Sequence, residues 1–298
     1  MTLLMTSIEQ GLIFAVLAIG VFITYKLLDI ADLSVEGTFP FGAFVFAKFI
    51  SMGVNPIIST LMAFLFGTLA GLLTSTLFTK LKIKPLLSGI LTMTILYSIN
   101  LRINGKSNIP LFSYGSIYDL GLTLLILGII VLTIKVLIDV FLKTEIGYLL
   151  TATGDNEALV KSLGENSNKY KVMGLMLSNG LVALSGALMA QYQGFADITM
   201  GSSIIVVALA SIIIGDTLKK NSSFIKGTTR AIIGAVIYKI IGGVAIDLGL
   251  NPNDLKAINA IIVIAFISYN NFAIDIFGIF RKKEGKQSVE SSKPIKEF

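Results

Sequence analysis

Hydrophobic stretches of about 20 residues recur along almost the whole chain, and they limit the possible folds more than any other feature. A stretch of this length crosses a lipid bilayer as one helix, because lipid offers backbone groups no other hydrogen-bond partner. Charged residues make up only 14% of the chain, against about 25% in soluble domains. The sequence therefore predicts an all-α membrane protein.

The hydrophobic stretches predict about nine transmembrane helices, within a range of 8–10. Two of the stretches, 38–51 and 201–217, are short for a full crossing. We assign residues 1–280 to one transmembrane domain and the polar residues 281–298 to a tail that is predicted to be disordered. The predicted spans are 8–28, 38–51, 54–79, 85–103, 118–142, 172–192, 201–217, 228–248 and 256–279.

Most of the 24 Lys and Arg residues fall on one side of this predicted topology. Basic residues are enriched in cytoplasmic connections, so that side is predicted to be cytoplasmic, with the N-terminus outside and the tail inside. The same rule accounts for the net charge of +6 without a nucleic-acid partner. The basic segments are those around 26, 80–84, 143–171, 219–230 and 281–296.

The chain has no cysteine and no histidine. This composition excludes disulfides, the usual zinc and haem ligand sets, and a Ser-His-Asp triad. A phosphate-binding G-x-x-x-x-G-K-[ST] motif is also absent from the sequence. We therefore expect no metal, no cofactor and no catalytic residue, and any ATP hydrolysis must occur in another chain.

Two short segments resemble each other. Residues 31–35 read Ala-Asp-Leu-Ser-Val and residues 196–200 read Ala-Asp-Ile-Thr-Met. Each follows a long predicted span and precedes a short one, and an odd number of spans separates them. This is the pattern of an inverted-topology repeat in which spans 1–4 are repeated by spans 6–9. The alternative is a chance match of five residues.

The polar segment 144–171 interrupts the hydrophobic sequence and predicts a short amphipathic helix on the cytoplasmic side. Asp155 can cap its N-terminus, Glu157 suits its first turn, and Gly164 suits the position after its end. Its apolar residues could dock into a groove on a soluble partner; the alternative is a helix resting on the membrane surface. The candidate docking residues are Gly154, Asp155, Asn156, Glu157, Ala158, Leu159, Val160, Leu163 and Gly164, with Ala158, Leu159, Val160 and Leu163 as one apolar patch.

Three of the charged residues that lie within predicted spans are candidates for buried charges. Lys135 and Asp139 are four residues apart and are predicted to pair. Lys239 lies deep in a hydrophobic stretch, where an unpaired lysine costs about 3 kcal/mol. We expect it to face protein or water with Glu36, Asp32 or Asp216 as its partner; the alternative is that it extends to the membrane surface.

Polar residues at the ends of spans are candidates for a substrate pathway, although such residues are also ordinary interfacial anchors. The second span begins with polar residues whose free N–H groups could bind a carboxylate. Others lie near the predicted outer ends of the fourth and sixth spans. The candidates are Ser34, Glu36, Gly37, Thr38, Asn100, Gln191 and Gln193.

Two segments resemble one known family. The 50 residues ATGDNEALVKSLGENSNKYKVMGLMLSNGLVALSGALMAQYQGFADITMG resemble the coupling-loop region of ABC-importer permeases of the branched-chain amino acid and ribose permease superfamily. DLSVEGTFPFGAF, from Asp32 to Phe44, resembles the early segment of its sugar branch. Within the superfamily the chain is most similar to the subgroup paired with tryptophan- or tyrosine-binding lipoproteins. Glu36 departs from the small residue that is usual in sugar permeases, so a sugar substrate is disfavoured.

The resemblance implies a type II-like ABC importer in a bacterial cell membrane. It implies a second permease subunit, with a homodimer expected and a pseudo-symmetric pair of paralogues as the alternative, and an ABC ATPase dimer that receives the docking residues. It also implies an extracellular substrate-binding lipoprotein and an amino-acid cargo, with aromatic amino acids favoured. The residues alone leave open an ion-coupled secondary transporter that uses Lys239 with Glu36 or Asp32, a membrane enzyme and a channel.

Overall fold

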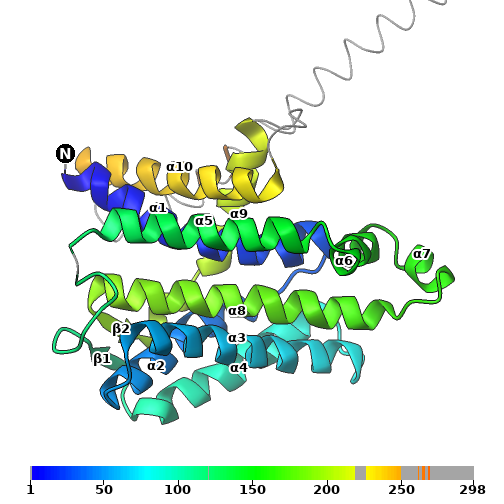
Figure 1. Cartoon of the computed structure of the whole chain (residues 1–298), viewed down its shortest axis with the longest axis horizontal. Coiled ribbons are helices and arrows are strands. Elements are labelled where there is room, and N and C mark those ends of the chain that lie inside the picture. Colours follow the sequence, from blue (N-terminus) through cyan, green and yellow to red (C-terminus); the bar gives the residue numbers. More distant parts are fainter. Residues whose placement is uncertain are drawn as a thin grey trace, which may run out of the picture.

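The protein is an all-helical bundle with one two-stranded sheet at one end (Figure 1). The computed structural model describes residues 2–119, 121–218 and 226–249, together with residues 261, 264, 265 and 268. The helices are α1 (Thr2–Phe22), α2 (Val35–Ser51), α3 (Pro56–Thr79), α4 (Pro85–Asn104), α5 (Thr123–Phe141), α6 (Glu145–Asp155), α7 (Glu157–Ser162), α8 (Ser167–Gln193), α9 (Ile204–Leu218) and α10 (Gly227–Asp247).

Three shorter features complete the described chain. A π-helical turn, Ile23–Leu27, extends α1, and a 3₁₀-helix, η2 (Ile198–Gly201), precedes α9. Strands β1 (Asn108–Pro110) and β2 (Phe195–Asp197) pair antiparallel, with Ile109 opposite Ala196. We call the end of the bundle with this sheet the sheet end and the opposite end the α7 end (Figure 1).

Seven helical segments in the described residues are long and apolar enough to cross a membrane. They correspond to seven of the predicted nine spans. The predicted span 38–51 forms α2, whose 17 residues are fewer than the about 20 that a crossing needs. The predicted span 256–279 and the tail 281–298 lie outside the described residues. The all-helical class is confirmed, and the count of nine is not.

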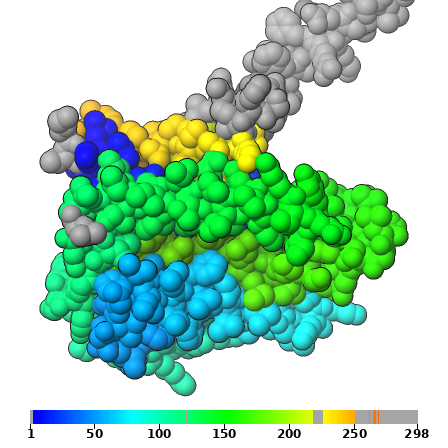
Figure 2. Space-filling view, viewed as in Figure 1, coloured from blue at the N-terminus to red at the C-terminus, as the bar shows by residue number. Residues whose placement is uncertain are grey.

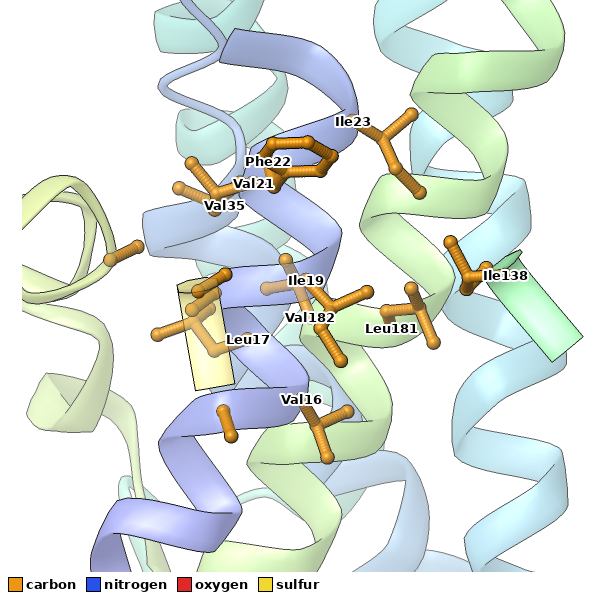
Figure 3. Packing of buried hydrophobic residues seen from close by; sticks show 14 of the residues in the cluster. Val16, Leu17, Ile19, Val21, Phe22, Ile23, Val35, Ile138, Leu181 and Val182 are labelled. Carbon is orange, nitrogen blue, oxygen red and sulfur yellow. The ribbon is translucent and has the colours of Figure 1, made fainter. Parts of the chain in front are cut away.

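The core lies along α1 and α8. Figure 3 shows Ile19 of α1 beside Leu181 and Val182 of α8, with Ile138 of α5 close by. Small residues let α3 approach α8 very closely: a Cβ atom added at Gly71 would lie 2.3 Å from the Leu175 carbonyl oxygen. Close backbone approach of this kind is how helices associate in lipid.

The groove of about 810 Å³ between α3 and α5 has α8 at its base and is almost wholly apolar (Figure 2).

The arrangement of the helices supports the predicted inverted repeat. In the predicted repeat, α1 corresponds to α8 and α3 corresponds to α10. The two corresponding pairs both pack together, α1 on α10 and α8 on α3. The two similar segments also form the same turn: the Ser34 N–H donates to Asp32 Oδ1 at 2.9 Å, and the Thr199 N–H donates to Asp197 Oδ1 at 2.8 Å. Each turn leads into a short helix, α2 or α9. These helices run toward opposite ends of the bundle, as inverted halves should.

Candidate functional site

Helices α6 and α7 lie at the α7 end, where α7 projects beyond the spanning helices (Figure 1). Asn156 separates the two helices with an extended backbone, and its Oδ1 accepts the Leu159 N–H at 3.1 Å. Asn156 is therefore the N-cap of α7. The prediction that Asp155 is this cap is wrong, because α6 continues to Asp155 and includes it. A sequence with adjacent Asp and Asn offers two good caps, and only the end of α6 decides between them.

The C-terminus of α7 confirms the predicted role of Gly164. Its φ of +82° is in the left-handed region, where glycine carries no side-chain penalty. The Gly164 N–H donates to the Lys161 carbonyl at 3.0 Å, and the Glu165 N–H donates to the Val160 carbonyl at 3.2 Å. This pair of bonds is a Schellman motif. Helix α7 is thus closed at both ends.

The predicted apolar patch of α7 is divided between two faces. Val160 is fully buried against the rest of the protein, so its assignment to an exposed docking patch is wrong. Leu159 is 51% exposed and Leu163 is 64% exposed, and residues four apart lie on the same face of a helix. Ala158 is exposed as well. The surface formed by Ala158, Leu159 and Leu163 is hereafter the α7 face.

Glu157 fixes α7 to the start of α8. Its carboxylate accepts from Lys161 Nζ and Lys171 Nζ, each at 2.8 Å, and from the Ser167 hydroxyl at 2.9 Å. The hydrogen bonds from Lys161 and Lys171 lower the pKa of Glu157 from its ordinary value of 4.5 to about 2. Since the folded-state pKa is lowered, this stabilisation is fully present above pH 4.5 and is lost as the pH falls toward 2.

Glu157→Gln is therefore expected to loosen α7 at pH 6 but to change little at pH 2.5, where the wild-type interaction is already weakened. Amide hydrogen exchange of residues 157–163 in the two proteins, compared at each pH, measures this. Asp155→Asn, which removes an exposed carboxylate two residues earlier, is the control and should leave this exchange unchanged. An equal effect of Glu157→Gln at both pH values would contradict the electrostatic explanation.

Gly154 contacts the end of α1 rather than the surface. A Cβ atom added at Gly154 would lie 2.0 Å from the Leu27 carbonyl oxygen. Helix α6 therefore packs directly on the backbone of the π-helical turn. That turn leads through residues 28–34 to the start of α2, and this connection contains the buried polar residues Asp32 and Ser34.

A buried polar cluster links this connection to α8. Asn179 Nδ2 donates to Asp32 Oδ2 at 2.8 Å, and Asn179 Oδ1 accepts from the Ser34 and Thr38 hydroxyls at 3.0 and 2.7 Å. Ser34 and Thr38 are fully buried. The structure thus assigns them contacts within the bundle instead of the predicted place along a pathway. Asn179 was missed at the sequence level, although a lone amide within a hydrophobic span was a usable signal.

Three of the predicted pathway residues lie together. Glu36, Gly37 and Asn100 line a cavity of about 700 Å³ between the start of α2, α4 and η2. The cavity lies within the length of α4, one of the spanning helices. Asn100 is fully buried, and neither its Nδ2 nor its Oδ1 has a hydrogen-bond partner in the described chain. The other lining residues are Pro40, Met93, Thr94, Tyr97, Ser98, Ile198, Thr199, Gly201 and Ser202.

The predicted pathway residues Gln191 and Gln193 do not line this cavity. Gln191 Nε2 donates to Thr60 Oγ1 at 2.9 Å, and its Oε1 accepts the Ile117 N–H at 3.1 Å. Gln193 Nε2 donates to the Phe195 carbonyl at 2.8 Å. Both side chains therefore hold the sheet end together. Sequence alone places them at the end of a span but does not show which neighbours satisfy their amides.

Lys239 is not paired with a carboxylate among the described residues, so the predicted partner is wrong. Its Nζ lies 3.7 Å from the centroid of the Phe14 ring, a cation–π contact. Of the predicted partners, Asp216 binds Lys26 at 2.9 Å and Arg230 at 3.3 Å, and Asp32 is bound to Asn179.

The other predicted charge pair is confirmed. Lys135 Nζ lies 2.8 Å from Asp139 Oδ2. The same carboxylate binds Lys226 at 2.9 Å and the Thr228 hydroxyl at 2.6 Å, so it connects α5 to the start of α10. This cluster lies at the α7 end and joins helices within the chain, so we treat it as structural.

Seven long hydrophobic helical segments in the described residues define a multi-span α-helical membrane protein, and polar residues line its cavity between α2, α4 and η2. Residues 3–268 match the family described as "Branched-chain amino acid transport system / permease component", and the chain belongs to this family. It is therefore a permease component of a transport system.

Individual relatives agree with this family. The chain is 48% identical over 274 residues to the tyrosine transport system permease protein of Clostridioides difficile, covering 92% of this chain and 93% of the relative. It is 26% identical to the ribose import permease protein of Haemophilus influenzae, covering 90% and 85%. Among solved structures, PsaBC from Streptococcus pneumoniae in complex with Fab has a TM-score of 0.52 at 15% identity, over 89% of this chain and 91% of that one. This last similarity shows the fold alone.

Proposed function

We propose that this chain is the membrane-spanning subunit of an ATP-binding-cassette importer whose ATPase is a separate protein. The observation that carries the proposal is the α7 face. It presents two exposed leucines on a helix that is closed at both ends and fixed by Glu157. A short, rigid helix with an apolar face fits a groove on a partner.

The proposed orientation places the α7 end in the cytoplasm. The described basic residues are concentrated at that end, whereas only a few lie toward the sheet end, and cytoplasmic segments carry such an excess. The N-terminus would then lie outside. The basic residues at the α7 end include Lys26, Lys80, Lys82, Lys84, Lys143, Lys161, Lys169, Lys171, Lys226 and Arg230, and those toward the sheet end include Lys48, Arg102 and Lys106.

The proposed complex contains two permease subunits, two ATPase subunits and an extracellular substrate-binding lipoprotein. Residues 1–280 form the permease domain, and the docking site for each ATPase is the α7 face. The proposed cargo is an amino acid, with tyrosine first, because the relative at 48% identity is named for tyrosine transport. Glu36, Gly37 and Asn100 are the proposed pathway residues, because they line one cavity.

In the proposed mechanism, ATP-driven movement of the ATPase displaces α7 and α6. Helix α6 transmits this movement through the Gly154–Leu27 contact to the connection that leads into α2. The Asp32–Asn179 bond couples the same connection to α8. Because α2 lines the cavity, its displacement would open the cavity alternately to the two sides. An ion-coupled relay has less support, since Lys239 faces the Phe14 ring instead of a carboxylate.

Reconstitution tests the proposal. The chain would be expressed with the proposed ATPase and substrate-binding lipoprotein, and the purified complex would be placed in proteoliposomes. Radiolabelled tyrosine should accumulate only with ATP and the lipoprotein. Uptake by this chain alone, driven by a sodium or proton gradient, would instead establish a secondary transporter.

A further inference from the structure

The cavity between α2, α4 and η2 contains one charged group among its described lining residues, the carboxylate of Glu36. This residue lies in the first turn of α2, and its carboxylate accepts the backbone N–H of Ser203. None of the described salt bridges involves Glu36. A carboxylate within a membrane domain is costly unless a cation compensates it. Among the described residues, the cavity therefore has a negative charge without a matching positive one.

Asn100 supplies the second polar group of the cavity. Its buried amide can donate two hydrogen bonds and accept others, yet it makes none within the described chain. A buried amide without partners is destabilising, so such groups in native proteins call for an explanation. A ligand in the cavity would provide the missing partner.

The remaining lining residues set the character of the ligand. Thr94, Ser98, Thr199 and Ser202 offer hydroxyl groups, while Met93, Pro40, Ile198 and the ring of Tyr97 offer apolar contact. A volume of about 700 Å³ lies within the range of about 300–1,000 Å³ that is usual for small-molecule sites. The lining thus combines an anion, an amide, several hydroxyls and an apolar wall.

We propose that Glu36 is a substrate-binding residue that recognises the ammonium group of the transported solute, while the Asn100 amide donates to its carboxylate. This inference rests on the proposed function and adds to it the chemical basis of selection. A zwitterionic amino acid satisfies both groups at once. A neutral sugar would leave the Glu36 charge uncompensated, which gives the site a physical reason to reject it.

The competing explanation is that Glu36 only caps the start of α9 through the Ser203 N–H. Glu36→Gln separates the two explanations, because the amide oxygen still accepts that N–H but carries no charge. Glu36→Asp keeps the charge on a shorter side chain. Asp247→Asn is a matched control, because Asp247 is an exposed carboxylate at the end of α10 and lies outside the described lining of the cavity and outside the connection before α2.

The experiment measures ATP-dependent uptake of radiolabelled tyrosine by the full complex in proteoliposomes, with the same lipoprotein for every variant. Recovery of the ATPase and thermal stability are measured in parallel. We expect Glu36→Gln to lower uptake by about tenfold or more, as loss of a charge-assisted bond implies. We expect Glu36→Asp to restore part of this loss, and we expect ATPase recovery and the uptake of Asp247→Asn to match the wild type.

Wild-type uptake by Glu36→Gln would overturn the inference, as would an equal loss in Asp247→Asn or no restoration by Glu36→Asp. The proposed function itself fails on a different result, namely the absence of ATP-dependent uptake and of a bound ATPase in the wild-type complex.

Asn100→Ala should lower uptake severalfold at unchanged thermal stability, because the Asn100 amide makes no hydrogen bond within the described chain. A loss of stability without a loss of uptake would remove Asn100 from the site.

Discussion

Leu159→Asp is expected to abolish co-purification of the ATPase while the permease still folds and inserts into the membrane. Leu159 is 51% exposed on the α7 face and contributes little to the core. An aspartate there remains solvated in the free permease but would bury an unpaired charge when a partner covers the face. Leaving a buried charge unpaired costs several kcal/mol, or more than a hundredfold in affinity. Affinity purification from solubilised membranes, with quantification of both subunits, measures the result.

Two further substitutions define the limits of this prediction. Leu81→Asp changes a leucine that is 63% exposed at the same end of the bundle but outside α7, and it should leave the complex intact. Val160→Asp places a charge in a fully buried position, so it should lower the yield of folded permease instead of acting only on the complex. Normal ATPase recovery with Leu159→Asp, or equal loss with Leu81→Asp, would remove the α7 face as the docking surface.

Asn179→Leu is expected to destabilise the permease by about 3 kcal/mol, because it deprives the buried Asp32 carboxylate of a donor and two hydroxyls of their acceptor. Leucine has a similar volume, so the effect reports the lost hydrogen bonds more than a cavity. Thermal or denaturant unfolding of the purified protein measures the change. Transport should fall as well, since the cluster fixes the connection that leads into α2.

Asn168→Leu is the matched control for this prediction. Asn168 is exposed near the start of the same helix, and the same replacement there removes an amide that water can solvate. Its unfolding should stay close to that of the wild type. Equal stability of the two variants would show that the buried cluster contributes little to the fold.

The spanning helices were predictable from the sequence because lipid imposes one requirement on every span, a long hydrophobic helix. Helix α2 shows where this signal becomes insufficient. Its hydrophobicity matches that of a span, but its length of 17 residues follows from a start beside η2, inside the bundle. Only the packing of distant segments determines that starting point.

The site was predictable in part for a similar reason. Glu36, Gly37 and Asn100 were identified as polar residues in hydrophobic surroundings, and they do lie together. Ser34 and Thr38 have the same sequence signal, yet they bind Asn179, which lies more than 140 residues away in the chain. Lys239 required a partner, and the sequence favoured a carboxylate because it contains no signal for an aromatic ring one helix away. The type of residue indicates a need for a partner, whereas the fold selects which partner meets it.

The absence of a side chain at Gly154 has a mechanical consequence. Because the backbone of α6 packs directly on the Leu27 carbonyl, no side chain of Gly154 lies between them that could change rotamer when α6 moves. A flexible side chain such as that of methionine at this contact could change rotamer and so take up a small displacement of α6. The glycine instead makes the contact stiff, so that a shift of one ångström at α6 must become a comparable shift of the end of α1.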